Sequence, residues 1–264
     1  MPKRRLNEAL GDLVEGLARW QLWVLLGWND IRQRYRRSIV GPFWITISMA
    51  VMIGGLGYMY AELFNQRLDE YLVYLAAGII VFNLMSSVLT DGTQVFISSA
   101  RAILQAKAPL SIYVYQMIWR NMLIFLHNIS IQLILLIIFQ VKIGPSVVLA
   151  LAGLFLIMIN SIWAAILLGG LSARFRDIPP IVASLMQVAF FLTPIFWKRE
   201  NLPNREAFVD LNPFYYFIEV VRMPLLGQIP PLRIWLVVAA MTCVGGLISL
   251  VFFARYRRRI AYWI

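Results

Sequence analysis

Long apolar runs separated by short polar segments dominate the pattern of the chain. A helix that crosses a bilayer needs about 20 apolar residues, and the stretch 41–60 has that length without a charged side chain. Runs over about 72–89, 117–139, 147–171 and 235–254 have the same character, and a shorter run covers 181–197. The pattern therefore predicts an all-α integral membrane protein with six transmembrane helices, of which the fifth is the shortest.

The segment before the first run has a different, helical periodicity. Apolar residues recur at helical spacing from Leu6 to Trp28, and charged residues, Asp12 among them, occupy the other side between Lys3 and Arg19. This pattern is typical of an amphipathic helix on the membrane surface, with a simple anchor for the first span as the alternative. We assign 1–38 to an interface helix and basic segment, and 39–264 to the six-span domain.

The polar segment before the last run contains its own helix signal. Asn212 can cap a helix that has Pro213 at its first position, and Glu219 and Arg222 are three residues apart and can pair on it. About eleven apolar-rich residues are too few to cross a bilayer. We expect short re-entrant or interfacial helices here.

Composition and charge place these elements relative to the membrane. Hydrophobic residues make up 61% of the chain and charged residues 14%, against about 45–50% and 25% in soluble domains. The segments 1–38, 98–111, 172–180 and 255–264 together carry sixteen Lys or Arg and five acids, which accounts for the whole net charge of +11. The positive-inside rule makes this side cytoplasmic, and six spans put both termini there.

Several kinds of chemistry have no sequence signal. The chain has no phosphate-binding loop of the G-x-x-x-x-G-K-[ST] type, one histidine (His127), and Asp91 as the one carboxylate at a span end. We therefore expect no catalytic residues, no metal, no cofactor in this chain, no ion coupling and no nucleic-acid partner. If the chain moves a solute uphill, another subunit supplies the energy.

Two polar segments are candidates for function. The arginines Arg32, Arg34, Arg36 and Arg37 stand directly before the first span, and guanidinium groups bind phosphate oxygens in a bidentate fork. We predict contact with a substrate headgroup, with topological anchoring and anionic-lipid binding as the alternative. A short helix-prone piece between the second and third spans, ended by Pro109, can transmit motion from a cytoplasmic partner or be an ordinary loop; its candidates are Arg101, Gln105, Lys107 and Pro109.

Several motifs together resemble a known family. They are the segment from Asp30 to Trp44, Arg176-Asp177-Ile178, the segment from Thr193 to Trp197, the segment from Leu211 to Phe214, and the tail from Arg257 to Ile264. In this order and spacing they resemble the membrane subunit of ABC-2-type exporters of cell-surface polysaccharides, the O-antigen, capsule and teichoic-acid permeases. The resemblance covers nearly the full length.

The resemblance implies a homodimer of six-span subunits paired with two separate ATP-binding cassette subunits, which hold ATP and Mg. The interface helix, about Leu6–Trp28, and the loop Ser98–Pro109 would meet those subunits, and short helices over Asn212–Leu226 would face the periplasm. The implied substrate is a glycan on a lipid carrier, commonly undecaprenyl diphosphate. It would cross the bacterial inner membrane through a channel between the two copies.

With this resemblance, the four arginines would lie at the level of the lipid diphosphate. Sugars stack on aromatic rings, so Tyr58, Tyr60, Tyr71, Tyr74 and Phe82 are candidates for the channel lining, with an interfacial aromatic belt as the alternative. Lipid-linked O-antigen is the favoured cargo. The alternatives are a permease for capsular polysaccharide, teichoic acid, drugs or small lipids, and a membrane-embedded glycolipid enzyme, which would need clustered catalytic carboxylates or histidines.

Overall fold

A computed structural model describes residues 3–36, 41, 43–141, 144–201 and 206–264. These residues form helices and connecting segments without a β-strand, which confirms the all-α prediction. In chain order the helices are α1 (Lys3–Ala18), α2 (Trp20–Arg34), α3 (Phe43–Leu63), α4 (Leu68–Ser98), α5 (Ala100–Gln105), α6 (Ser111–Ile138), α7 (Val147–Arg174), α8 (Ile178–Leu192), the short 3-10 helix η1 (Arg199–Asn201), α9 (Glu206–Asp210), α10 (Pro213–Leu225) and α11 (Leu232–Trp263).

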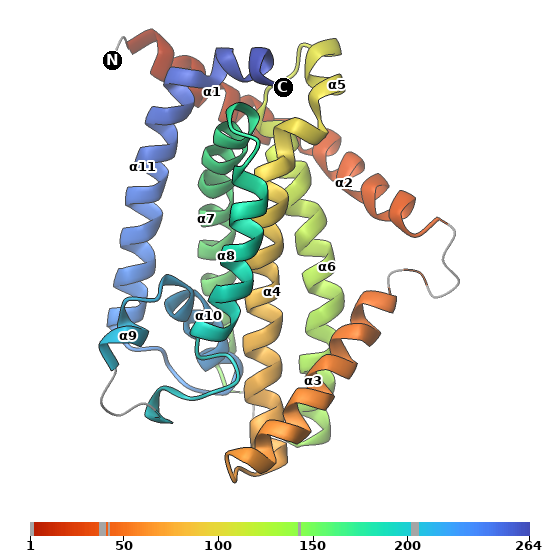
Figure 1. The fold of residues 1–264 in the computed structure, drawn as a ribbon, viewed down its shortest axis with the longest axis vertical. Helices are drawn as coiled ribbons and strands as arrows, with labels where there is room; N and C mark the ends of the chain where they lie inside the picture. The colour runs from red at the N-terminus through yellow and green to blue at the C-terminus, as the bar shows by residue number, and fades with distance from the viewer. Residues whose placement is uncertain (1–2, 37–40, 42, 142–143, 202–205) are drawn as a thin grey trace.

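Helix α4 is the centre of the bundle. It contacts α3, α6, α7, α8 and α10, and Figure 1 shows it between them. In the most apolar 18-residue stretch of α4, 67% of the residues are buried. The corresponding stretch is 17% buried in α3 and 22% buried in α11. The central position of α4 follows from these contacts, since α3 and α11 are also apolar enough to cross a membrane but are mostly exposed.

Small residues bring the helices of the core close together. A Cβ atom added to Gly92 of α4 would lie 3.2 Å from the Cα of Ala165 in α7. One added to Gly153 of α7 would lie 2.7 Å from the carbonyl oxygen of Val220 in α10. Close backbone approach of this kind drives helix association in membranes, and it sets the position of α10 against α7.

Among the residues that the structure describes, five helices are long and apolar enough to cross a membrane by length and composition: α3, α4, α6, α7 and α11. The predicted fifth span is a shorter helix, α8, followed by a non-helical segment at Thr193–Trp197. Pro194 explains this end, because a proline forces the preceding residue out of the helical conformation and Thr193 is extended (φ −89°, ψ 139°). A sixth span is therefore not confirmed, although α8 runs alongside α4 in Figure 1.

The N-terminal segment differs from the single amphipathic helix that we expected. It forms two helices, α1 and α2, which meet at Arg19 (φ −83°, ψ 40°). Asp12, predicted on the solvent side, is 3% exposed, while Val14 and Leu17 are exposed. The placement of Asp12 on the solvent side was wrong, because α1 packs on α6 and α11 through the face that carries this residue.

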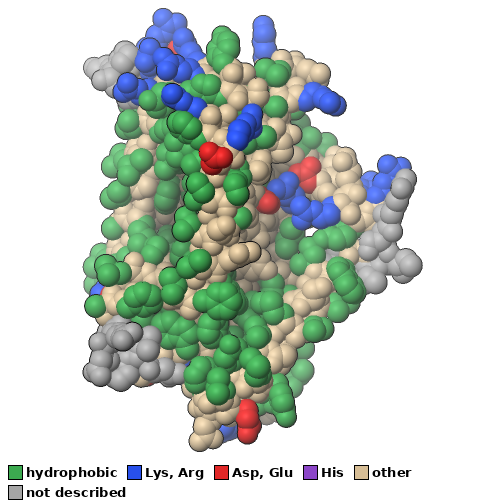
Figure 2. Space-filling model, viewed as in Figure 1, with side chains coloured by type: hydrophobic (Ala, Val, Ile, Leu, Met, Phe, Trp, Pro, Cys, Tyr) green, Lys and Arg blue, Asp and Glu red, His purple; other side chains and the backbone are tan. Residues whose placement is uncertain are grey.

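The two ends of the bundle differ in charge. Both chain termini, α1 and α5 lie at one end (Figure 1), and Lys and Arg side chains gather there in the face shown in Figure 2. We call it the basic end. Helices α9 and α10 lie toward the opposite end (Figure 1).

The helix predicted from Pro213 is confirmed as α10. Asn212 is its N-cap, with its side-chain oxygen accepting a hydrogen bond from the Phe214 N–H at 3.0 Å. The Glu219–Arg222 pair is also confirmed. The helix is buried deeply rather than lying on the surface, since Arg222 is 0% exposed and α10 contacts α4, α7 and α11. A re-entrant path through a membrane remains a prediction.

Candidate functional site at the basic end

Three of the four predicted arginines lie at the end of α2. Arg32 and Arg34 belong to its last turn, and Arg36 follows in the turn after it. All three side chains are exposed, and none forms an ion pair with another described residue. Cations at a helix C-terminus are stabilised by the helix dipole. Arg37 lies outside the described residues. The end of α2 thus presents three guanidinium groups that are available to an anion.

A charged network joins α2 to two spans just before these arginines. Arg120 of α6 forms an ion pair with Asp30 of α2 at 3.0 Å and with Asp91 of α4 at 2.8 Å. Gln116 donates to Asp30 at 2.9 Å and Asn121 donates to Asp91 at 3.0 Å. The sequence pattern predicted neither the contact between Arg120 and Asp91 nor the role of Asp30.

A polar pocket of about 340 Å³ opens at this network. Its lining comes from α2, α4 and α6 and from the residue between α4 and α5: Asp30, Asp91, Gln94, Val95, Ser98, Ser99, Tyr113, Gln116, Met117 and Arg120. Figure 2 shows acidic and basic side chains together beside α2. No three metal-ligating side chains come together in the described part of the chain.

A buried carboxylate, that of Asp12, fastens α1 to the bundle. The Asp12 side chain is 0% exposed and accepts hydrogen bonds from the backbone N–H groups of Leu110 (3.1 Å) and Ser111 (3.0 Å), at the start of α6. Arg257 of α11 donates to it at 2.7 Å, and Arg258 pairs with Glu8 at 2.5 Å. The partners of Asp12 are about 100 and 245 residues away in sequence, so no local signal could reveal this contact.

The loop between α4 and α6 contains the predicted coupling residues. Arg101 and Gln105 lie on α5 and Lys107 follows it; all three are exposed, whereas Pro109 is buried. Leu104 is also 64% exposed. The loop ends where Asp12 binds the start of α6, so α1, α5 and the C-terminal part of α11 share one surface of the basic end.

The predicted channel aromatics do not form one surface. Tyr71 is 0% exposed and Phe82 4%; as placed, they pack in the core and offer no open ring to a ligand. Tyr74 is half-buried and Tyr60 stacks between Phe64 and Phe196, with ring centroids at 5.8 and 5.3 Å. Tyr58 alone of the five is exposed, at 72%.

The tyrosines of α4 instead hold the segment after α8. The Tyr71 hydroxyl donates to the Phe196 carbonyl at 2.5 Å, and the Tyr74 hydroxyl lies 3.3 Å from the Trp197 carbonyl oxygen. Arg222 stacks on the Tyr74 ring at 3.9 Å and donates to the Pro194 carbonyl at 3.0 Å. These contacts explain the burial of Arg222, which the sequence did not indicate.

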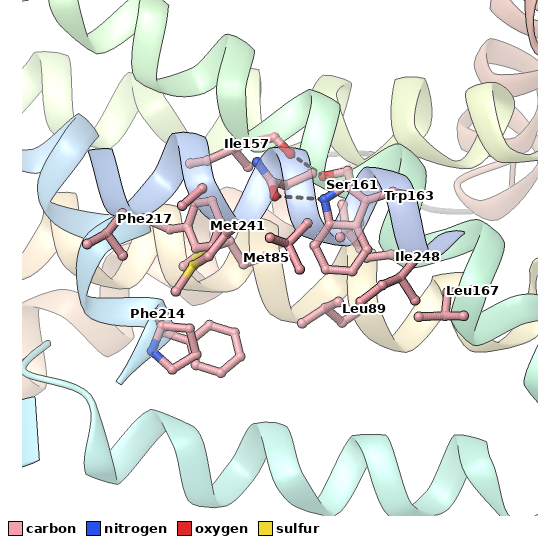
Figure 3. Close-up of a pocket in the computed structure, with 18 residues that line it drawn as sticks. Met85, Leu89, Ile157, Ser161, Trp163, Leu167, Phe214, Phe217, Met241 and Ile248 are labelled. Carbon is pink, nitrogen blue, oxygen red and sulfur yellow. Dashed lines mark hydrogen bonds between the residues drawn. The ribbon is translucent and has the colours of Figure 1, made fainter. Parts of the chain in front are cut away.

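An apolar cavity of about 660 Å³ lies between α4, α7, α10 and α11. Figure 3 shows Met85, Phe214 and Met241 around it. Its polar side chains already have partners: Asn160 donates to Thr242 at 2.7 Å and accepts from Trp163 at 2.7 Å, and Ser161 donates to the Ile157 carbonyl at 2.8 Å. The cavity therefore presents apolar surface only.

These features define a multi-pass membrane protein with an accessible arginine cluster at one end. The chain matches the ABC-2 type transporter family over residues 21–226, and since this is more than half of its length, it belongs to that family. Members of the family are transporter subunits, not enzymes themselves, and normally work with an ATP-binding partner.

The chain is also similar to curated permeases. It is 22% and 23% identical, over 199 and 200 residues, to two proteins named O-antigen export system permease protein RfbA from Klebsiella pneumoniae; each match covers 74% of this chain and 76% of the relative. It is 20% identical over 201 residues to the protein of the same name from Myxococcus xanthus, with 73% and 75% covered.

Proposed function

We propose that this chain is the transmembrane subunit of an ATP-driven exporter of lipid-linked polysaccharide, with undecaprenyl-diphosphate-linked O-antigen as the favoured cargo. The observation that carries the proposal is the cluster of Arg32, Arg34 and Arg36, exposed and without an ion-pair partner in the described chain. Guanidinium groups recognise phosphate bidentately, and a lipid diphosphate supplies that group at the membrane surface.

The basic end faces the cytoplasm in this proposal. The positive-inside rule favours this orientation, and it places both termini inside, with α8 as a short sixth span and α10 at the periplasmic side. Two copies form the channel in the bacterial inner membrane. The surface made by α1, α5 and the C-terminal part of α11 receives the ATP-binding cassette subunit, since Arg101, Gln105 and Lys107 are exposed there.

The arginine cluster can be tested in vesicles that contain this chain and its ATP-binding subunit. The double variant Arg34→Gln/Arg36→Gln removes two charge-assisted contacts worth about 1.5–3 kcal/mol each when buried. Because both arginines are exposed, we expect less than this, about 0.7–1.4 kcal/mol each, which is roughly a 10–100-fold loss of glycolipid transport at limiting substrate. We expect insertion and dimerisation to stay unchanged, since both side chains are exposed and neither forms an ion pair within the described chain.

A matched control removes the same charge elsewhere on the basic end. Arg174, the last residue of α7, and Arg176 are exposed and, like Arg34 and Arg36, two residues apart. The variant Arg174→Gln/Arg176→Gln should transport at nearly the wild-type rate. Equal losses in both double variants would show that net charge, rather than the end of α2, governs transport. Lost insertion or inverted topology in Arg34→Gln/Arg36→Gln would reduce these arginines to orientation signals.

A further inference from the structure

The polar pocket at Arg120 is built from two stripes of polar residues at helical spacing. On α4 the stripe consists of Asp91, Gln94 and Ser98, and on α6 of Tyr113, Gln116 and Arg120. Intervals of three, four and seven residues place side chains on one face of a helix. Polar and charged side chains are costly in membrane-spanning helices and mark functional sites there. These two faces meet each other and Asp30 at the pocket.

The charge of the pocket limits what it can bind. Two carboxylates, Asp30 and Asp91, enclose one guanidinium, that of Arg120, which leaves one net negative charge. Phosphate would be repelled by this charge. A divalent cation would be opposed by the guanidinium, and no third carboxylate, histidine or cysteine joins the pair in the described residues. A neutral polar ligand meets neither penalty.

The hydrogen-bonding groups left over in the pocket suit hydroxyl groups. Both hydrogen bonds to Asp30 and both to Asp91 end on Oδ2, so the Oδ1 atom of each carboxylate has no donor within the described chain. The buried Arg120 Nε also lacks an acceptor there. Carboxylate oxygens accept from hydroxyls, guanidinium donates to them, and glutamine and serine side chains do both.

We propose that this pocket binds one neutral sugar ring. Its volume of about 340 Å³ is at the lower end of the range of about 300–1,000 Å³ for small-molecule sites. A ring with adjacent hydroxyls would donate to the free Oδ1 atoms of Asp30 and Asp91. It would also exchange hydrogen bonds with Gln94 and Gln116.

The proposal rests on the proposed function for its physiological ligand. Arg34 is four residues beyond Asp30 on α2, which places both on the same face, about 6 Å apart along the helix axis. A sugar bound beside Asp30 would thus have its attached diphosphate within reach of Arg34. We assign the pocket to the sugar that adjoins the lipid diphosphate, while the arginines hold the phosphates.

The pocket can be tested with the purified full-length protein in detergent, independently of transport. The probes are the methyl glycosides of glucose, galactose, mannose and N-acetylglucosamine, and binding is measured by saturation-transfer NMR. The variant Gln94→Leu removes an exposed lining amide outside the ion-pair network. The control Gln228→Leu makes the same change at an exposed position in the turn between α10 and α11.

We expect wild type and Gln228→Leu to bind at least one glycoside and Gln94→Leu to bind it about tenfold more weakly, as for the loss of a neutral hydrogen bond in a polar site. No binding of any glycoside, or equal binding by all three proteins, would overturn the proposal. Transport by the same variants separates the two hypotheses. Sugar binding at the pocket without glycolipid transport would contradict the proposed function but not the site, whereas normal transport without sugar binding would contradict only the site.

Discussion

Asp12 offers a direct test of how α1 is fastened to the bundle. The change Asp12→Asn keeps the volume of the side chain and removes its charge. The carboxylate is fully buried and accepts from Leu110, Ser111 and Arg257. Breaking a buried ion pair costs about 3–5 kcal/mol. Because the Arg257 side chain is 30% exposed, water can solvate it after the change, so we expect the lower end, about 3 kcal/mol.

This loss should appear as local release of α1 rather than as global unfolding. A cost of about 3 kcal/mol corresponds to roughly a hundredfold faster amide exchange in α1, measured by hydrogen–deuterium exchange and mass spectrometry. Glu15→Gln is the matched control, since it makes the same change on the same helix. Its pair with Arg19 is about half exposed, at 54% and 47%, and is worth about 0–1 kcal/mol.

The reasoning would be refuted if α1 exchanged at the wild-type rate in Asp12→Asn. It would equally be refuted if Glu15→Gln accelerated exchange to the same extent, because the effect would then not depend on burial of the carboxylate.

Three further predictions concern packing and coupling. Gly153→Ala should lower the melting temperature by roughly 5 °C, because its Cβ would press on the α10 backbone, whereas Gly246→Ala, with no atom within 4 Å of its Cβ, should not lower it. Arg222→Met should destabilise the fold by about 3–5 kcal/mol by leaving Glu219 buried and unpaired, and adding Glu219→Gln should restore part of the melting temperature. Leu104 is exposed on α5, so Leu104→Ala should leave the melting temperature unchanged. It should weaken binding of the ATP-binding subunit about tenfold in a pull-down titration. Unchanged binding would show that Leu104 is not part of the surface that binds this subunit.

The sequence predicted those elements whose causes are local. The cap at Asn212 and the pair on α10 depend on residues within one or two turns, and both are confirmed. The second span was predicted to end before Asp91, whereas α4 continues to Ser98. Its extension depends on Arg120, 29 residues further along, which balances the charge of Asp91. Such a partner has no local signature.

The same distinction applies to the candidate site. The arginines at the end of α2 were found because they are adjacent in sequence. The aromatic residues were grouped by type, but α4 turns Tyr71 and Phe82 into the core, where packing decides their role. The Asp30–Arg120–Asp91 network joins three helices, and nothing local in the sequence indicates which faces of these helices meet.

Movement of a lipid-linked glycan across vesicle membranes tests the central claim most directly. Vesicles would contain the ATP-binding subunit and an undecaprenyl-diphosphate glycan, with or without this chain, and the glycan reaching the opposite leaflet would be measured with a membrane-impermeant lectin. The account predicts ATP-dependent labelling in the presence of this chain. Labelling that is independent of the chain, or transport of a drug or small lipid in place of the glycan, would contradict it.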